Sequence, residues 1–243
     1  MPTNPSSAPI VFIHGSGDSA RIWRFQVEHL GSQRAYAIDL PGHGLRPDSL
    51  PPEVSVQDYA GVVHAIIHDE LRLERPIIAG HSLGGAIALQ MGLDYGNELG
   101  GLILIGTGAR LRVHPDLLEG ARTGSAVAAR QLTTLAVSPE NAATIPDQLL
   151  REGPQSEQNM LYRDLSACNV FDCMARLSEI HLPTLIICGS DDRLTPPKYS
   201  QYMHDHLAGS TLRIIPHAGH FVMREQPAEV NAAIDDFLAN GTP

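Results

Sequence analysis

The sequence predicts one α/β domain, in which a mostly parallel sheet of about six strands is covered by helices. Two observations carry this prediction. Short apolar runs alternate along the chain with longer stretches of helical period, and three of the six runs contain no polar residue. The chain has 243 residues, of which 43% are hydrophobic, enough for one substantial core and too few for two full-sized domains.

Six apolar runs are predicted to form the sheet. Continuous apolar runs are typical of parallel strands covered by helices on both sides, because neither face of such a strand meets water. In chain order the predicted strands are Ile10 to Ile13, Arg34 to Ile38, Pro76 to Ala79, Leu102 to Ile105, Thr184 to Cys188 and Leu212 to Ile215.

Helix start signals stand between these runs. Ser19 precedes an amphipathic stretch, and Ser55 with Asp58 three residues later is a capping pair. Pro227 opens the last predicted helix, residues 228–238, where a proline costs no hydrogen bond. The strands and helices therefore alternate, as in a parallel sheet built from crossover units.

One interval is far longer than the usual connection between a strand and the next. Between the strands at 102–105 and 184–188 the chain contains several helical segments punctuated by Gly and Pro, and no strand-like run. We expect an inserted helical cap (lid) at residues 110–176, with residues 1–109 and 177–243 forming the core. The expected cap helices lie within Pro115 to Gly120, Ala126 to Val137, Pro139 to Glu152 and Gln155 to Val170.

The charge balance disfavours several classes of partner. Acidic residues number 27 and basic residues 17, which gives a net charge of −10 and opposes binding to nucleic acid or an anionic membrane surface. No apolar run approaches the length of a bilayer span, and the opening residues lack the pattern of a secretory signal. The expected location is cytoplasmic, and the expected oligomeric state is a monomer or a homodimer.

Cys168, Cys173 and Cys188 are the three cysteines of the chain, and their spacing matches no metal site. We expect buried thiols. A disulfide between Cys168 and Cys173 is the alternative that the spacing allows, although cytosolic chains rarely keep one.

The strongest chemical signal lies at residues 77–85, where a strand ends in G-x-S-x-G and an Ala-rich helical stretch follows. In this context the pattern predicts a nucleophile elbow, a turn so tight that Gly80 and Gly84 have no room for side chains. Ser82 is then exposed at the carboxyl edge of the sheet. The helix behind it supplies free N–H groups that suit a developing oxyanion.

A serine hydroxyl needs a base, and the base needs a carboxylate to orient it. Two later loops leave strands at the same edge of the sheet. The loop after residue 188 contains Asp191 and Asp192, and the loop after residue 215 contains His217 and His220. The chain order Ser, Asp, His agrees with this architecture.

Five motifs in this order resemble those of the α/β-hydrolase superfamily, in particular its serine-nucleophile, carboxylesterase-like branch with a helical cap. The resemblance covers nearly the whole chain. The motifs are H-G-S-G at 14–17, D-L-P-G-H-G at 39–44, G-H-S-L-G-G at 80–85, G-S-D-D-R-L-T-P at 189–196 and A-G-H-F at 218–221. One departure is visible: only nine residues precede Ile10, so the usual N-terminal pair of antiparallel strands is expected to be missing.

The resemblance implies a catalytic triad of Ser82, Asp192 and His220. It selects Asp192 over the neighbouring Asp191, because the family's acid lies three residues after the glycine of the loop. It likewise selects His220 over His217.

The resemblance also implies an oxyanion hole made by the backbone N–H groups of Ser16 and Leu83. His14 is expected to hold the loop that carries Ser16 rather than to take part in the chemistry.

The implied reaction is acyl transfer to serine followed by hydrolysis, with no metal and no organic cofactor. The leading hypothesis is a carboxylesterase acting on small to medium acyl esters. Alternatives within the enzyme class are a C–C bond hydrolase, an enol-lactone hydrolase, a thioesterase, a perhydrolase and an esterase for acyl-carrier-protein methyl esters. A ligand-binding receptor on the same fold is the alternative outside it.

Trp23, His81 and Phe221 are the candidate residues of the substrate pocket, with packing in the core as the alternative for each. Apolar residues after the first loop and in the cap are expected to join them. These are Ile22, Phe25, Leu111, Leu117, Leu118, Leu132, Leu135, Leu149 and Met160.

Overall fold

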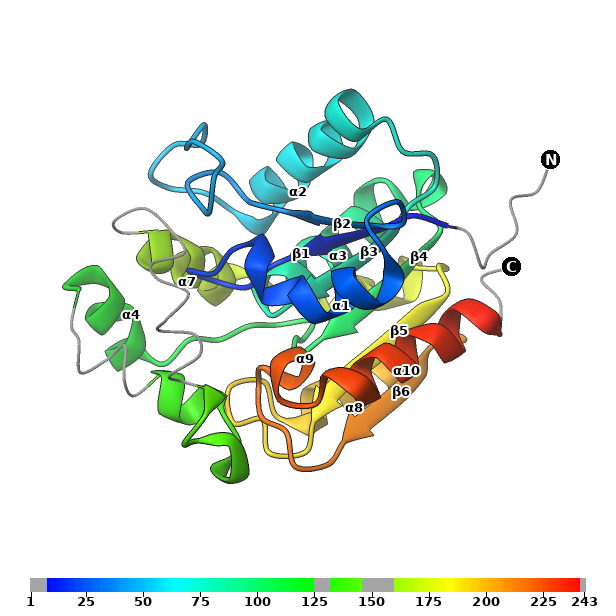
Figure 1. Ribbon diagram of the computed structural model, residues 1–243. Helices are drawn as coiled ribbons and strands as arrows, with labels where there is room; N and C mark the ends of the chain where they lie inside the picture. The colour runs from blue at the N-terminus through cyan, green and yellow to red at the C-terminus, as the bar shows by residue number, and fades with distance from the viewer. Residues whose placement is uncertain (1–7, 125–131, 146–159, 241–243) are drawn as a thin grey trace.

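The computed structural model describes residues 8–124, 132–145 and 160–240. Its centre is one sheet of six parallel strands in the order β2-β1-β3-β4-β5-β6 (Figure 1). The strands are β1 (Ile10–Ile13), β2 (Ala35–Ile38), β3 (Ile77–His81), β4 (Gly101–Ile105), β5 (Thr184–Gly189) and β6 (Thr211–Ile215).

Each predicted strand is confirmed to within two residues at either end. In the described part of the chain every pairing between these six strands is parallel. Residues of β1 alternate between the two faces: Val11 and Ile13 join one core cluster, and Ile10 and Phe12 join the other. This alternation explains why the strand is apolar throughout.

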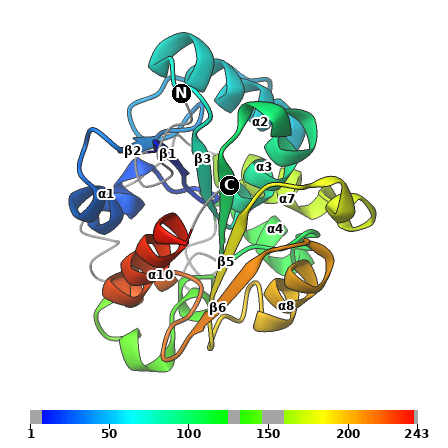
Figure 2. The ribbon, with the colours of Figure 1, turned by 90° about the vertical axis from the view of Figure 1, so that its right-hand side faces the viewer.

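Helices cover both faces of the sheet (Figures 1 and 2). One core cluster lies beneath α2 (Val56–Ala65), α3 (Leu83–Asp94) and α8 (Pro197–His206), and α2 continues into a π-helical turn at Ile66–Leu71. The other lies beneath α1 (Arg24–Leu30), α9 (Val222–Glu225) and α10 (Pro227–Ala239), with a 3-10 turn at Ala20–Trp23 before α1. A further short turn, Gly96–Glu98, leads into β4.

The helix starts follow the local signals. Ser55 and Asp58 form a complete capping box, in which the Ser55 hydroxyl accepts from the Asp58 N–H and the Asp58 carboxylate accepts from the Ser55 N–H. Pro227 occupies the first turn of α10. Both predictions are confirmed.

Between β4 and β5 the chain leaves the sheet and carries α4 (Pro115–Arg122), a turn at Pro139–Asn141, α7 (Met160–Val170) and a turn at Met174–Glu179. The predicted helical segments 126–137, 139–152 and 155–170 lie in part outside the described residues. Arg110 and Asp172 bridge the two ends of this insertion. The three cysteines are free and buried, as expected from the sequence, so Cys168 and Cys173 form no disulfide.

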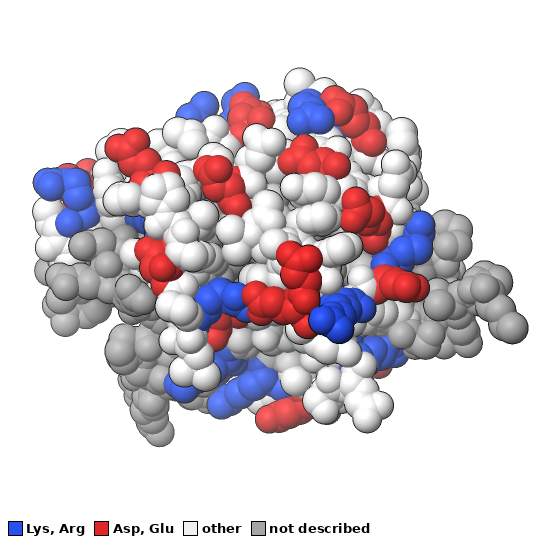
Figure 3. Space-filling view, turned by 90° about the horizontal axis from the view of Figure 1, so that it is seen from above, with Lys and Arg blue, Asp and Glu red and all other residues white. Residues whose placement is uncertain are grey.

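The face that carries α2 is viewed in Figure 3. Acidic side chains are spread across it, several of them beside basic ones, and the described residues form no continuous basic area there. No helix in the described parts of the chain is long and apolar enough to cross a membrane.

Candidate active site

Ser82 occupies a strained turn between β3 and α3. Its φ of 52° and ψ of −114° lie in a region that side chains rarely adopt, which is typical of residues held in place by their surroundings. A Cβ on Gly80 would lie 2.0 Å from the carbonyl oxygen of Gly84, and a Cβ on Gly84 would lie 2.2 Å from that of Ile13. Only glycine fits at either position, so the sharp turn that exposes Ser82 depends on both.

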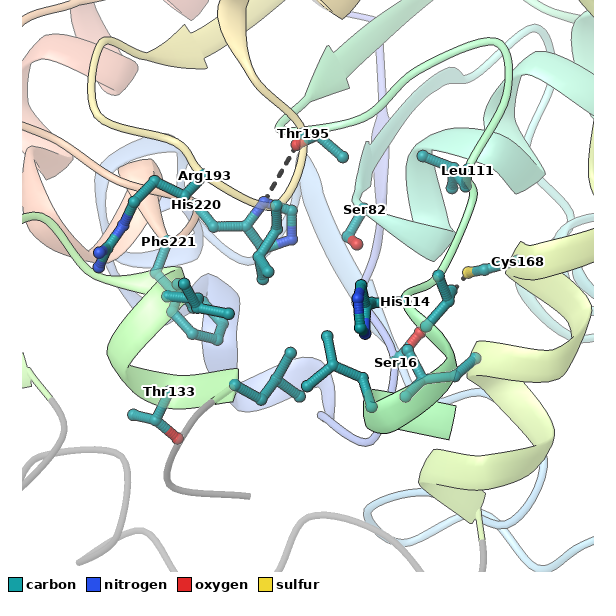
Figure 4. Close-up of a pocket in the computed structure, with 18 of the residues that line it drawn as sticks. Ser16, Ser82, Leu111, His114, Thr133, Cys168, Arg193, Thr195, His220 and Phe221 are labelled. Atoms are coloured by element: carbon teal, nitrogen blue, oxygen red, sulfur yellow. Dashed lines mark hydrogen bonds between the residues drawn. The ribbon is translucent and has the colours of Figure 1, made fainter. Parts of the chain in front are cut away.

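The loops after β5 and β6 bring Asp192 and His220 together. The Asp192 Oδ2 and His220 Nδ1 atoms are 2.9 Å apart, and both side chains are almost fully buried. The two loops can approach so closely because Gly189 lacks a Cβ, which would lie 2.2 Å from the Ala218 carbonyl oxygen. Ser82 and His220 line the same cavity (Figure 4).

The other two candidates from these loops lie apart. The Asp191 side chain accepts a hydrogen bond from Ser190, and the exposed His217 pairs with Glu140 at 2.8 Å. Neither contact reaches Ser82. The structure thus places Asp192 and His220, rather than their neighbours, beside one another.

Hydrogen bonds hold Asp192 in its ionised form. Burial raises the pKa of this carboxyl group, but the charge and hydrogen bond of His220 and the hydrogen bonds of Thr195 outweigh burial and lower it. Oδ1 accepts from the N–H groups of Leu194 and Thr195, at 2.9 and 2.8 Å. Oδ2 accepts from the Thr195 hydroxyl at 2.8 Å as well as from His220.

The loop after β1 lies against Ser82, and His14 shapes it. Leu40 N–H donates to His14 Nε2 at 3.0 Å, so Nδ1 carries the ring proton and donates to the Gly15 carbonyl at 2.8 Å. Burial, together with the neighbouring His43, lowers the pKa of His14 to about 4. These two bonds link the neutral ring to the backbone of its own loop and of Leu40, and a purely structural role for His14 stays a prediction.

A cavity of about 920 Å³ opens over Ser82. His81 and Phe221 line it, and His81 also contacts the His220 carbonyl through Nε2 at 3.0 Å. That they border a bound substrate stays a prediction. Burial and the nearby His220 lower the pKa of His81 well below its ordinary value, which keeps the ring neutral. The apolar lining comes largely from the insertion and includes Leu111, Leu117, Leu132, Leu135 and Leu165.

The prediction for Trp23 was wrong. Its side chain is fully buried beneath the sheet, with its ring centroid 4.9 Å from that of Phe12, and it does not line the cavity. Ile22 is buried in the same core cluster. The turn Ala20–Trp23 directs these residues toward the sheet, because its apolar side would otherwise face water. Phe25, Leu118 and Met160 also lie outside the cavity lining, and Leu149 lies outside the described residues.

Comparison with known proteins identifies the family. The family model described as "Alpha/beta hydrolase family" matches residues 10–233. This chain belongs to the alpha/beta hydrolase family.

Relatives of this alpha/beta hydrolase include a putative carbamate hydrolase, RutD, from Variovorax paradoxus (strain S110). It is 30% identical over 95% of this chain and 91% of the relative. Among solved structures, a thermophilic esterase is 34% identical with a TM-score of 0.81, over 95% of this chain and 89% of that one. Est816, described as an N-acyl homoserine lactone degrading enzyme, is 29% identical with a TM-score of 0.82, over 95% and 93% of the two chains.

Thr195, which the sequence analysis did not single out, also belongs to the site of this alpha/beta hydrolase. Its hydroxyl donates to Asp192 and lies 3.1 Å from His220 Nδ1, so one side chain touches both partners. Figure 4 shows the contact with His220. The sequence held a local signal for this contact. An Asp side chain commonly accepts hydrogen bonds from the backbone two and three residues later, and Thr195 lies three residues after Asp192.

Arg193 was also missed. Its guanidinium donates to the carbonyls of Thr134 and Val137, which ties the loop of Asp192 to the insertion. Among the described residues, no group of three or more His, Cys, Asp or Glu side chains is placed to hold a metal ion.

Proposed function

We propose that this protein is a serine hydrolase, and that it acts as a carboxylesterase on small to medium acyl esters. Ser82 is the nucleophile, His220 the general acid and base, and Asp192 the carboxylate that orients His220. The observation that supports the proposal most directly is the 2.9 Å contact between His220 Nδ1 and Asp192 Oδ2, at a cavity that also contains the elbow serine.

In the first half-reaction Asp192 keeps the ring proton of His220 on Nδ1, so Nε2 is free to take the proton of Ser82. The Ser82 oxygen attacks the ester carbonyl and a tetrahedral intermediate forms. His220 then gives the proton to the leaving alcohol, and the acyl group remains on Ser82. Water repeats the sequence with His220 as base and releases the acid.

The negative oxygen of each tetrahedral intermediate is stabilised by the backbone N–H groups of Ser16 and Leu83. Leu83 is the first residue of α3, so its N–H points outward from a helix start, where the helix dipole favours negative charge. Losing one donor of this kind raises the barrier by about 3 to 4 kcal/mol. The scheme needs no metal or organic cofactor.

The cavity supports the proposed substrate class. A cavity of about 920 Å³, whose apolar lining includes six leucines, accommodates an acyl chain of moderate length, and Phe221 and His81 border the reacting end. Residues 110–176 act as the cap in this proposal, because they provide much of the apolar lining. The similarity to a thermophilic esterase agrees with this substrate class.

A second candidate is hydrolysis of a carbamate. It is favoured by the relative described as a putative carbamate hydrolase, which matches nearly the whole chain. A carbamate carbonyl would be attacked by the same serine and stabilised by the same N–H groups. Lactone hydrolysis uses the same steps and corresponds to the description of Est816.

The test is hydrolysis of p-nitrophenyl esters from acetate to laurate, alongside phenyl carbamate and an acyl homoserine lactone, by the wild type and by Ser82→Ala. We expect turnover to peak at short or medium chains and to vanish in the variant. A preference for the carbamate or the lactone would move the assignment to that substrate. No turnover and no labelling of Ser82 by a fluorophosphonate would refute the serine hydrolase and favour a ligand-binding protein.

A further inference from the structure

Helix α7, which belongs to the insertion, contacts the core through the buried side chain of Asp164. This side chain is fully buried and accepts three hydrogen bonds from three separate segments. Oδ2 accepts from the Gly17 N–H at 2.8 Å and from His43 Nε2 at 2.9 Å, and Oδ1 accepts from the Tyr59 hydroxyl at 2.6 Å. Asp164 does not line the cavity, so it cannot touch a substrate there.

The bond to Gly17 falls next to the proposed oxyanion donor, the N–H of Ser16. Gly17 has a φ of 68°, and the side chain of Leu161 lies 3.0 Å from where a Cβ of Gly17 would be. The Ser16 hydroxyl lies 3.7 Å from the thiol of Cys168. Three residues of one face of α7, at positions 161, 164 and 168, thus contact the two residues that determine how this loop presents its N–H groups.

The His43 ring that donates to Asp164 carries a proton on both nitrogens. His43 Nδ1 donates to the Pro41 carbonyl at 3.0 Å, so for Nε2 also to donate to Asp164 the ring must be protonated. Burial alone would lower the pKa of His43, but the hydrogen bond and charge of Asp164 outweigh burial and raise it. The hydrogen bond from Gly17 therefore goes to a carboxylate, which makes it stronger and more directional than a bond to a neutral acceptor.

The adjacent residue on α7 anchors the same helix elsewhere. Arg163 donates from Nη1 to both oxygens of Asp48, from Nη2 to the Pro41 carbonyl and from Nε to the Tyr59 hydroxyl. None of these bonds reaches the loop at residues 15–17. Arg163 shares the Tyr59 hydroxyl with Asp164 and the Pro41 carbonyl with His43, but of these two α7 residues only Asp164 bonds to the loop.

We propose that Asp164 is a positioning residue for the oxyanion hole, which it aims from α7 through the N–H group of Gly17. The inference rests on the proposed function, because it assigns a role in stabilising the intermediate on Ser82. Without Asp164 the peptide groups around Ser16 lose their charged acceptor, and the Ser16 N–H no longer points steadily at the oxyanion. The insertion then serves the chemistry as well as covering the cavity.

The test compares Asp164→Ala and Asp164→Asn with Arg163→Ala as the matched control. Complete loss of an oxyanion donor costs a factor of about 100 to 1,000 in kcat, so misdirection of one donor should lower kcat of Asp164→Ala by about 10- to 100-fold, with KM within about threefold. Asp164→Asn should lose less, because its amide oxygen can still accept from Gly17. Arg163→Ala should lower the melting temperature but change kcat by less than about threefold.

Affinity for an alkyl boronic acid separates positioning from general loosening of the fold. Its tetrahedral adduct on Ser82 places an oxygen in the oxyanion hole, so the affinity should fall in parallel with kcat in the Asp164 variants and stay near the wild-type value in Arg163→Ala. If Asp164→Ala does not fold, the comparison of Asp164→Asn with Arg163→Ala decides the matter.

Unchanged kcat and boronate affinity in the folded Asp164 variants, or an equal loss in Arg163→Ala, would refute this inference and leave the proposed function standing. A wild type that neither hydrolyses esters, carbamates or lactones nor reacts with fluorophosphonate would refute the proposed function, and the inference with it.

Discussion

Replacing Asp192 with asparagine should reverse the hydrogen bonding of His220. Oδ1 of Asp192 accepts from two backbone N–H groups, those of Leu194 and Thr195, whereas Oδ2 faces His220 Nδ1. An asparagine that keeps its oxygen on the two backbone donors turns its NH₂ group toward His220. Nδ1 must then accept, the ring proton moves to Nε2, and His220 can no longer take the proton of Ser82.

The opposite orientation of the asparagine amide group is unfavourable in free energy. It would set the NH₂ group against the two backbone donors and leave two buried hydrogen bonds unmade, at about 1 to 3 kcal/mol each. The reversed tautomer should therefore dominate. An enzyme of this kind with the wrong tautomer loses about 10⁴-fold in kcat, equivalent to about 5.4 kcal/mol of transition-state stabilisation.

The assay is steady-state hydrolysis of p-nitrophenyl butyrate by Asp192→Asn, with thermal unfolding to verify the fold. Asp191→Asn is the matched control, because it changes the neighbouring carboxylate and should keep kcat within about twofold of the wild type. A loss below about tenfold in Asp192→Asn, or an equal loss in Asp191→Asn, would show that Asp192 does not orient the base.

Three further predictions concern stability. Gly80→Ala should lower the free energy of unfolding by about 3 kcal/mol, because the new Cβ would lie 2.0 Å from backbone. Gly61→Ala lies in open space within α2 and should raise it by about 0.5 to 1 kcal/mol. Urea unfolding measures both changes, and equal effects would contradict the clash at Gly80. The pKa of His43 is raised above 6.5 in the folded state, so its pairing with Asp164 contributes fully below pH 6.5 and is lost as the pH rises through the folded-state pKa. Unfolding from about pH 5.5 to about pH 9 should show the advantage of the wild type over His43→Gln shrinking toward alkaline pH, and a constant difference would be evidence against the ion pair. Trp23→Ala should lower the free energy of unfolding by about 3 to 5 kcal/mol and leave KM unchanged. A large rise in KM would show that Trp23 contacts the substrate.

The strands and the elbow could be predicted because their signals are local. A parallel strand covered on both faces must be apolar along its whole length, so β3 and β4 are visible as uninterrupted runs. The turn at Ser82 requires glycine at positions 80 and 84, where a Cβ would collide with backbone. Such requirements act on residues adjacent in the chain and remain readable in the sequence.

The sequence by itself therefore determined the sheet, several of the helices that cover it, the elbow and the pair of loops that contain Asp192 and His220. Tertiary structure alone decided whether an apolar residue such as Trp23 turned to the core or to the cavity, since both environments accept the same side chain. It also decided the contact between Asp164 and Gly17, which are 147 positions apart in the chain. Such a hydrogen bond depends on how two distant segments pack together, and the sequence of neither segment predicts it.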